Sequence, residues 1–381
     1  MSRRILIVAS DLDEPSQRRT FDGLEAAGHE VRMVGFRRRN MPRAKGQSTE
    51  LGRIGNGVTL PRLAALARGA GRLAHRREMR WADTIVVRNL DMALVALWAK
   101  KLTGTSAEMV YQCLDIHSVM TAPGMLGRLA RWSERRVLRR SSLLVVSAPD
   151  FLTRYFMPRQ RYTGPAQVQE NRILWHGGSY PQRRVRPPRA SGHPIVLGWV
   201  GTLRCPASFD LLLQVAAAGG SGLRLEFHGV IHHHQLPGAT ARIAAYPNVS
   251  LHGGYAYPDG LAQVYARLDC VWGQDMWQAG TNSDWLLPNR IYEAGYFGCP
   301  LLAIDGTATA AQLAAEGTGL VLPRASAEAV LRAVGDTQAL ASARARLDTL
   351  PAARFLQSPE GFAAGLLPPS RAPAQSKWAR A

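Results

Sequence analysis

The sequence predicts an α/β protein of two doubly wound domains that face each other across a cleft. Short apolar runs alternate with helical segments along residues 1–180, and the same alternation restarts at residue 195. Strands separated by helices of about 10–15 residues favour parallel sheets. Between the two halves, residues 181–194 (PQRRVRPPRASGHP) are rich in Pro and Arg without an apolar period, so we expect a linker there.

The N-terminal domain, residues 1–180, is expected to contain six strands. Each is a short apolar run that ends in polar or turn residues, and helical segments such as residues 91–102 separate them. In chain order the expected strands are RRILIVAS (3–10), HEVRMVGF (29–36), ADTIVVRN (82–89), EMVYQCLD (108–115), SSLLVVSAP (141–149) and ENRILWHGG (170–178).

The second domain, residues 195–350, is expected to contain six more strands, and residues 351–381 a C-terminal return segment and a disordered tail. Two Rossmann-like units joined in this way place the carboxyl ends of both sheets at the cleft, where α/β proteins bind ligands. In chain order these strands are PIVLGWVGTL (194–203), LRLEFHGV (223–230), NVSLHGG (248–254), CVWGQD (270–275), CPLLAID (299–305) and GLVLP (319–323).

Composition places the chain among globular proteins of the cytoplasm. Of its 381 residues, 46% are hydrophobic, and no apolar run approaches the roughly 18–20 residues that span a bilayer. The N-terminal apolar run meets Asp11 and Asp13 without a small-residue cleavage site, which favours a first strand over a signal peptide. The cysteines form no CxxC pair, so we expect reduced thiols at Cys113, Cys205, Cys270 and Cys299.

Positive charge is confined to the first half of the chain. Residues 1–190 contain 34 Lys and Arg against 15 Asp and Glu, whereas residues 191–381 contain 13 of each. The net charge of +19 therefore belongs to the N-terminal half. We expect that half to attract something anionic, such as nucleic acid, phospholipid headgroups or a phosphorylated substrate.

The segment LPNRIYEAGYFGCPLLAID (287–305) joins a helix to a buried strand and carries Arg290 and Glu293 on one helical face. The two side chains could form an ion pair, or they could bind the phosphate and the ribose of one nucleotide. The proline before them suits a helix start, whose free N–H groups favour phosphate. Gly198 and Gly201 indicate a second loop where the backbone can approach phosphates closely.

The segment LPNRIYEAGYFGCPLLA resembles the donor site of GT-B glycosyltransferases, especially the large retaining family with the pattern (K/R)xxEAxxxGxP. The resemblance implies the GT-B fold, with a nucleotide sugar, expected to be a UDP-sugar, in the second domain and a saccharide acceptor in the first. Further stretches resemble the family in order and spacing, namely AAGHEVRMVG, VYQCLDIH, ERRVLRRSSLLVVSAPDFL, ILWHGG, IVLGWVGTL and NVSLHGGYAYPDGLAQVYARLDCVW.

Carried over position by position, the resemblance implies a donor site that the second domain provides. Arg290 would contact the diphosphate and Glu293 the ribose. The remaining implied contacts are Gly201 and Thr202 near the phosphates, and Gly254 and Tyr255 near the base.

The chain departs from the retaining pattern at one position. A further glutamate stands eight residues before the second one in that pattern, where this chain has Trp285 beside Asp284. Inverting glycosyltransferases of the xanthan type show similar departures, so the stereochemical outcome stays open.

Asp115 is the predicted catalytic base, with His117 as its neighbour or alternate. If transfer inverts the sugar configuration, a cleft carboxylate or histidine must take the proton of the acceptor hydroxyl. Both residues follow a strand at its carboxyl end, where cleft residues are expected. The other interpretation of Asp115 is a cap of the following turn.

Three other polar groups suggest a metal or cleft role. Asp11 and Asp13 form a DxD pair, which we expect in the loop after the first strand, near the acceptor. His232–His234 are expected beside the donor phosphates, because three adjacent side chains rarely converge on one ion. His176 is a further cleft candidate. We expect no metal, and no cofactor besides the nucleotide-sugar co-substrate.

Two basic amphipathic stretches predict peripheral binding to an anionic membrane, on the inner face of the cell membrane. The alternative is ordinary surface helices that pack on the sheet. Residues 60–83 place Leu63, Leu66, Ala70 and Leu73 at helical spacing among arginines. Residues 124–140 do the same with Met125, Leu126, Leu129 and Trp132.

These observations predict a glycosyltransferase that moves a hexose or uronic acid to a saccharide acceptor, in bacterial exopolysaccharide or cell-surface glycan synthesis. A polyprenyl-diphosphate-linked acceptor would suit the basic half. One alternative is a GT-B enzyme acting on a soluble metabolite, which would not need the basic helices. Another is a non-catalytic nucleic-acid-binding protein, but the chain lacks a recognisable DNA or RNA module, so no nucleic-acid partner is expected.

Overall fold

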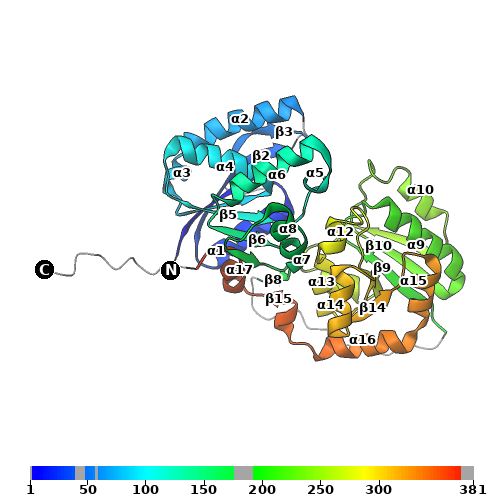
Figure 1. The fold of residues 1–381 in the computed structure, drawn as a ribbon. Helices are drawn as coiled ribbons and strands as arrows, with labels where there is room; N and C mark the ends of the chain where they lie inside the picture. The colour runs from blue at the N-terminus through cyan, green and yellow to red at the C-terminus, as the bar shows by residue number, and fades with distance from the viewer. Residues whose placement is uncertain (1, 39–47, 56–58, 176–191, 370–381) are drawn as a thin grey trace.

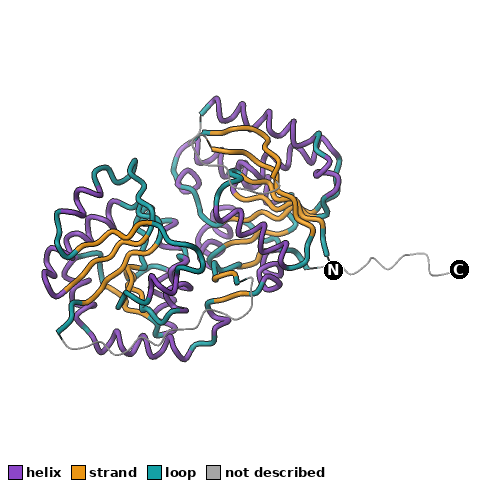
Figure 2. The backbone as a smooth tube through the Cα atoms, turned by 180° about the vertical axis from the view of Figure 1, so that it is seen from behind, coloured by secondary structure: helices purple, strands orange, loops and turns teal. Residues whose placement is uncertain are grey.

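The computed structural model describes residues 2–38, 48–55, 59–175 and 192–369. They form two α/β domains, each with a parallel sheet between layers of helices (Figure 1; Figure 2). The predicted linker 181–194 lies mostly outside the described residues, as do His176 and the tail from residue 370.

The N-terminal sheet has seven parallel strands in the order β3-β2-β1-β4-β5-β6-β7. Its order reverses at β1, next to β4, which is the switch point where α/β sheets open a ligand site. The strands are β1 (Arg4–Ala9), β2 (Glu30–Arg38), β3 (Ser48–Ile54), β4 (Thr84–Arg88), β5 (Glu108–Cys113), β6 (Leu143–Val146) and β7 (Ala166–Val168).

Helices cover both faces of this sheet. One face packs in a core with α2 (Leu60–Ala74), α4 (Asn89–Thr103) and α6 (Gly124–Leu138). The opposite face packs with α1 (Pro15–Ala26) and the C-terminal α17 (Pro359–Leu366). Shorter elements complete the domain: α3 (Arg77–Trp81), α5 (Ser118–Thr121), α7 (Pro149–Phe151), the π-helix η1 (Leu152–Phe156) and α8 (Met157–Gln160).

The second sheet has six parallel strands in the order β11-β10-β9-β12-β13-β14, as the six apolar runs predict. The strands are β9 (Ile195–Val200), β10 (Leu223–His228), β11 (Val249–Gly253), β12 (Cys270–Trp272), β13 (Leu301–Ile304) and β14 (Gly319–Leu322). The helices are α9 (Pro206–Gly219), η2 (Gly220–Gly222), α10 (Ala239–Ala244), α11 (Leu261–Tyr265), α12 (Asn282–Trp285), α13 (Asn289–Tyr296), α14 (Ala308–Glu316), α15 (Ala327–Gly335) and α16 (Thr337–Thr349).

The C-terminal segment crosses back to the first domain. After η3 (Ala352–Arg354), β15 (Leu356–Gln357) pairs in parallel with β8 (Ile173–Leu174), and α17 then packs on α1. The predicted strand 170–178 was therefore placed in the wrong sheet. Its backbone pairs with a segment far along the chain, and the sheet edge belongs to β7.

All four cysteines lie within the described residues, are buried and form no disulfide there. In the described part of the chain, no helix combines the length and apolar character that crossing a bilayer requires.

Candidate functional site: the interdomain cleft

A cleft of about 500 Å³ lies between the domains, and residues of both line it. From the first domain come the segments that follow β1, β4, β5 and β6, and from the second the segment after β9 and the start of α13. These are carboxyl ends of parallel strands on both sides, because the parallel connections return each chain segment to the same edge. Of the predicted site residues, Asp115, Gly201, Thr202, Tyr255, Arg290 and Glu293 line the cleft.

The start of α13 faces the cleft with Pro288 as its N-cap residue. Arg290 is half-buried and donates from Nη1 to the Trp272 carbonyl at 2.7 Å, while its other N–H groups have no partner in the described chain. Glu293 is buried and accepts a hydrogen bond from the Tyr265 hydroxyl at 3.2 Å. The two side chains make no ion pair with each other among the described residues, so the intrahelical-pair interpretation is wrong.

The carboxyl group of Glu293 is buried at the wall of the cleft, and its pKa is raised. Burial raises the pKa of its carboxyl, although the Tyr265 hydrogen bond and the charges of Arg19 and Arg290 oppose that rise. A buried carboxylate without an ion-pair partner at the wall of a cleft is costly unless a ligand supplies hydrogen-bond donors. Vicinal hydroxyl groups of a sugar are such donors.

The loop after β9 approaches the cleft through Gly201. Its φ of 111° is a conformation that side chains rarely adopt, and no atom lies within 4 Å of where a Cβ would stand. Gly198 was also predicted to serve this approach, and that prediction is wrong. A Cβ on Gly198 would lie 2.4 Å from Leu268 Cδ1, so this glycine serves the packing of β9 instead.

Tyr255 lines the cleft, whereas its neighbour Gly254 does not. Both follow β11 at its carboxyl end. A Cβ on Gly254 would meet only Val230, at 3.8 Å. The structure thus places Tyr255 with the other donor-wall residues and Gly254 one residue behind them.

Asp115 follows β5 and is tied to the opposite domain. Asn282 Nδ2 of α12 donates to Asp115 Oδ1 at 3.2 Å, and Asn282 Oδ1 accepts from the Ile116 N–H at 2.7 Å. Among the residues that the structure describes, no neighbouring backbone N–H donates to this carboxylate, so the turn-cap interpretation is not supported. Although Asp115 is accessible from the cleft, both domains crowd it, and this desolvation raises the pKa of its carboxyl despite the bond from Asn282 and the charge of Arg204.

His117 does not accompany Asp115 into the cleft. Its side chain is exposed, and Nδ1 accepts from the Val119 N–H at 3.3 Å as the cap of α5. His117 is only two residues beyond Asp115, yet its imidazole caps the backbone of α5 and does not face the cleft.

The other polar groups lie outside the cleft lining. Asp11 and Asp13 are in the loop after β1, as predicted, but Asp13 pairs with Arg37 and Asp11 lies 3.7 Å from Arg38 Nε. His232–His234 lie in the loop after β10. The rings of His232 and His234 stack, with their centres 5.4 Å apart. These contacts give the side chains structural partners of their own.

The sequence did not predict several residues in or beside the cleft. Arg204 and Asp275 line it and pair at 3.4 Å, and Asn282, buried behind the lining, donates to Asp115. Arg19 of α1 donates to the Tyr257 hydroxyl at 3.3 Å, which joins the two domains. Asp275 carried a usable signal, because it ends the strand segment CVWGQD, whereas Arg19 lies within a helix and carried none.

Arg88, at the end of β4, is a fully buried cation behind the acceptor wall. Burial lowers the pKa of its guanidinium to about 10. Its donors are occupied by Gln112, Ser16 and Thr20, and the carboxylate of Glu14 is 3.9 Å away.

Trp285 occupies the position where the resemblance leads one to expect a carboxylate. It is buried on α12, which contacts α7 of the N-terminal domain. Asp284 accepts from the Gly280 N–H at 2.9 Å, so its carboxylate serves the local loop. The cleft-lining carboxylates that the second domain contributes are Asp275 and Glu293.

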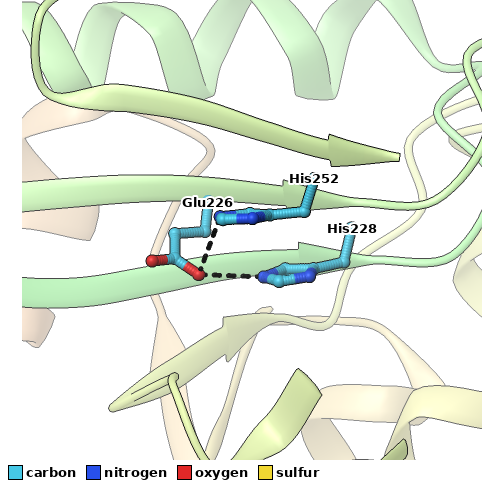
Figure 3. Close-up of side chains that lie close together, drawn as sticks. All are labelled: Glu226, His228 and His252. Carbon is cyan, nitrogen blue, oxygen red and sulfur yellow. Dashed lines mark hydrogen bonds and ion pairs between the residues drawn. The ribbon is translucent and has the colours of Figure 1, made fainter. Parts of the chain in front are cut away.

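Glu226, His228 and His252 form the group in the described chain whose atoms lie close enough together to hold a metal (Figure 3). Both histidines approach one Glu226 oxygen, at 2.9 and 3.3 Å. However, Arg267 binds the same carboxylate through two N–H groups. The imidazoles also stack within 9° of parallel at 4.4 Å, so their lone pairs run side by side and fit one ion poorly.

Two parallel-sheet domains with an interdomain cleft, a helix start and an arginine facing it define a GT-B glycosyltransferase. Residues 14–163 match the family model described as "Glycosyl transferase 4-like domain". The chain is 33% identical over 340 residues to the succinoglycan biosynthesis protein ExoL of Rhizobium meliloti, covering 87% of this chain and 84% of that protein. The chain therefore belongs to the glycosyltransferase 4-like family and is a glycosyltransferase.

Solved structures share the two-domain fold of this chain. HepE of Anabaena in complex with UDP-glucose has a TM-score of 0.66 at 15% identity, over 93% of this chain and 95% of that one. Sucrose-phosphate synthase of Thermosynechococcus elongatus has a TM-score of 0.67 at 15% identity, over 91% and 94%. At this identity the likeness extends to the fold.

Proposed function

We propose that the protein transfers a hexose or uronic acid from a UDP-sugar to a lipid-linked saccharide in exopolysaccharide or cell-surface glycan synthesis. The proposal rests on one observation: Arg290 and Glu293 both line the cleft, and within the described residues they form no ion pair with each other. The relative ExoL takes part, by its name, in succinoglycan biosynthesis. HepE, of the same fold, has been solved with UDP and UDP-glucose.

In the proposed complex, the diphosphate lies at the start of α13. Free N–H groups of the first turn and the unused donors of Arg290 would bind its oxygens. Glu293, one turn further, would accept hydrogen bonds from the ribose hydroxyls, and Tyr255 would lie near the base. Gly201 and Thr202 complete the phosphate loop. Guanidinium groups supply the positive charge, so we propose that transfer requires no metal ion.

Asp115 is the proposed base for the acceptor. Its carboxylate would take the proton of the acceptor hydroxyl while that oxygen bonds to the sugar C1, the bond between C1 and the β-phosphate oxygen breaks, and UDP leaves. A raised pKa suits this task, because a base works best when its pKa approaches the working pH. Asn282 would hold the carboxylate in place from the donor domain.

A face of the N-terminal domain supports a membrane-bound acceptor. On α4, Leu94, Trp98 and Leu102 recur every fourth residue and are exposed by 41%, 51% and 59%. Helix α4 contacts α2 on one side and α6 on the other (Figure 1). We call the exposed apolar residues of these helices the three-helix face: Leu60, Leu63, Leu94, Trp98, Leu102, Met125, Leu126, Leu129 and Trp132.

Exposed basic side chains lie on the same helices as the three-helix face. Lys101, Arg128 and Arg136 are exposed, and Arg136 lies over the Trp132 ring at 4.4 Å. Exposed apolar side chains together with cations suit the interface of an anionic leaflet, where each cation contributes about 1 kcal/mol. For the stripe predicted on α2 the prediction is wrong at three of four residues: Ala70 and Leu73 are buried in the core and Leu66 packs against it, so the packing alternative holds for them, and Leu63 is exposed. The enzyme would thus work at the inner face of the cell membrane.

A donor screen tests the proposal. UDP-, GDP- and ADP-sugars are incubated with the purified protein, and thermal stabilisation and nucleotide release are measured. Stabilisation by a UDP-sugar is expected, and Arg290→Ala should abolish it. A protein that no nucleotide sugar stabilises would contradict the proposal.

Two alternatives give different results. A transferase that acts on a soluble metabolite would not bind vesicles. Absence of flotation with acidic vesicles at low salt would therefore favour this alternative. A non-catalytic nucleic-acid-binding protein is excluded as the main function, because the chain belongs to an enzyme family.

A further inference from the structure

We infer that Arg19 is a second phosphate-binding cation, which reaches across the cleft so that a diphosphate is held between it and Arg290. The inference rests on the proposed function, since it presumes a diphosphate-bearing ligand in this cleft. Arg19 belongs to α1 of the N-terminal domain, whereas Arg290 belongs to α13 of the other. Both line the same cleft.

Within the described part of the chain, the guanidinium of Arg19 has no carboxylate partner. Its Nη1 donates to the Tyr257 hydroxyl at 3.3 Å, and its carbon lies 5.9 Å from the centre of that ring. No carboxylate of the described residues comes within ion-pair distance of it. Tyrosine is a neutral acceptor, so the contact positions the side chain and leaves its charge and most of its donors available.

The other cleft arginines are more fully engaged. Arg204 pairs with Asp275 at 3.4 Å, and the donors of Arg88 are occupied inside the N-terminal domain. Arg19 and Arg290 are therefore the two cleft guanidiniums with charge and donors to spare. Two such cations match the two negative charges of a diphosphate diester.

Arg19 shares the cleft with the proposed ribose acceptor, because Arg19, Glu293 and Arg290 all line it. The positive charges of Arg19 and Arg290 both act on the Glu293 carboxylate and oppose the rise in its pKa that burial causes. When the sugar leaves, the diphosphate gains a further negative charge, and a second guanidinium would stabilise that leaving group.

The same chemistry has two possible sources, the diphosphate of the sugar donor and that of a lipid-linked acceptor. Arg19 lines the same cleft as Glu293 and Arg290, the proposed donor-binding residues, which favours the donor. In either case, the contact joins α1 to Tyr257 of the opposite domain, so the site is complete only with the domains placed as they are here.

Isothermal titration of UDP, UMP and uridine against the wild type, Arg19→Ala and Arg19→Lys tests the inference. Arg19→Ala should weaken UDP about 10- to 100-fold, the usual effect of losing charged hydrogen bonds, and leave uridine unchanged. Arg19→Lys should recover part of the loss. The matched control is Arg224→Gln, which removes an exposed arginine on β10 outside the cleft and should bind UDP normally.

Each outcome decides a separate claim. If the wild type itself does not bind UDP, the proposed function fails. If the wild type binds UDP and a folded Arg19→Ala binds it equally, Arg19 does not bind the diphosphate of the sugar donor. Geranyl diphosphate is then titrated to test the diphosphate of the acceptor. A selective loss of geranyl diphosphate binding supports a diphosphate site for the acceptor, whereas no loss overturns the inference. Arg19→Gln serves as a second variant should Arg19→Ala unfold.

Discussion

Replacing Arg290 by alanine is the sharpest single perturbation of the proposed donor site. One N–H of the guanidinium is bound to the Trp272 carbonyl, and the others are available to a ligand. A hydrogen bond to a charged group is worth about 1.5–3 kcal/mol. Because Arg290 is only half-buried, we take about 2 kcal/mol, which corresponds to roughly 30-fold weaker UDP binding.

The same substitution should also cost the fold some stability. It removes one hydrogen bond from a charged group to the Trp272 carbonyl, worth about 1.5–3 kcal/mol, which lowers the Tm of a domain of this size by about 3–12 °C. Arg290→Lys keeps the charge without the planar fork and should fall between the wild type and alanine.

Calorimetric titration of UDP, with melting curves for each variant, measures both effects. The reasoning is refuted if Arg290→Ala remains folded and binds UDP as tightly as the wild type. A large loss of stability with unchanged affinity would assign Arg290 to the Trp272 carbonyl alone.

Three further predictions concern the base, the membrane face and acid stability. Asp115→Asn should lower turnover by about 10²–10⁴-fold while UDP binding persists, as product chromatography and calorimetry would show; normal turnover would remove Asp115 from the mechanism. Trp98→Glu together with Leu129→Glu should abolish flotation with acidic vesicles and leave UDP binding intact, and undiminished flotation would contradict the membrane role. Hydrogen bonds from His228 and Arg267 outweigh burial and hold the pKa of Glu226 at about 2, below its ordinary 4.5, so its stabilising effect is present above pH 4.5 and is lost as pH falls toward 2. Denaturant titrations from pH 7 to 3 should therefore show a shallower decline for Glu226→Gln than for the wild type; parallel curves would count against this.

The fold followed from local patterns where these were strong. All six strands of the second domain are apolar runs between turn residues, and the structure has them in one parallel sheet. Residues 170–178 misled the prediction because pairing between β8 and β15 joins segments far apart in sequence, which no local pattern reports. The short strands β3 and β7 were missed because neither is a continuous apolar run.

The candidate site was predictable on the donor side and less so across the cleft. Arg290 and Glu293 share a helix, so their spacing alone placed them together. The tie between Asp115 and Asn282 spans 167 residues and depends on how the domains meet. His117 shows that closeness in sequence does not place two side chains in one site. It lies two residues beyond Asp115, but its ring accepts a hydrogen bond from the Val119 N–H.

The central claim is that Glu293 binds the ribose while Arg290 binds the diphosphate of one nucleotide. The most direct measurement compares the affinities of UDP and 2′,3′-dideoxy-UDP for the wild type and for Glu293→Gln. We predict that the wild type prefers UDP and that Glu293→Gln loses most of this preference. An equal preference for UDP in both proteins would contradict the assignment.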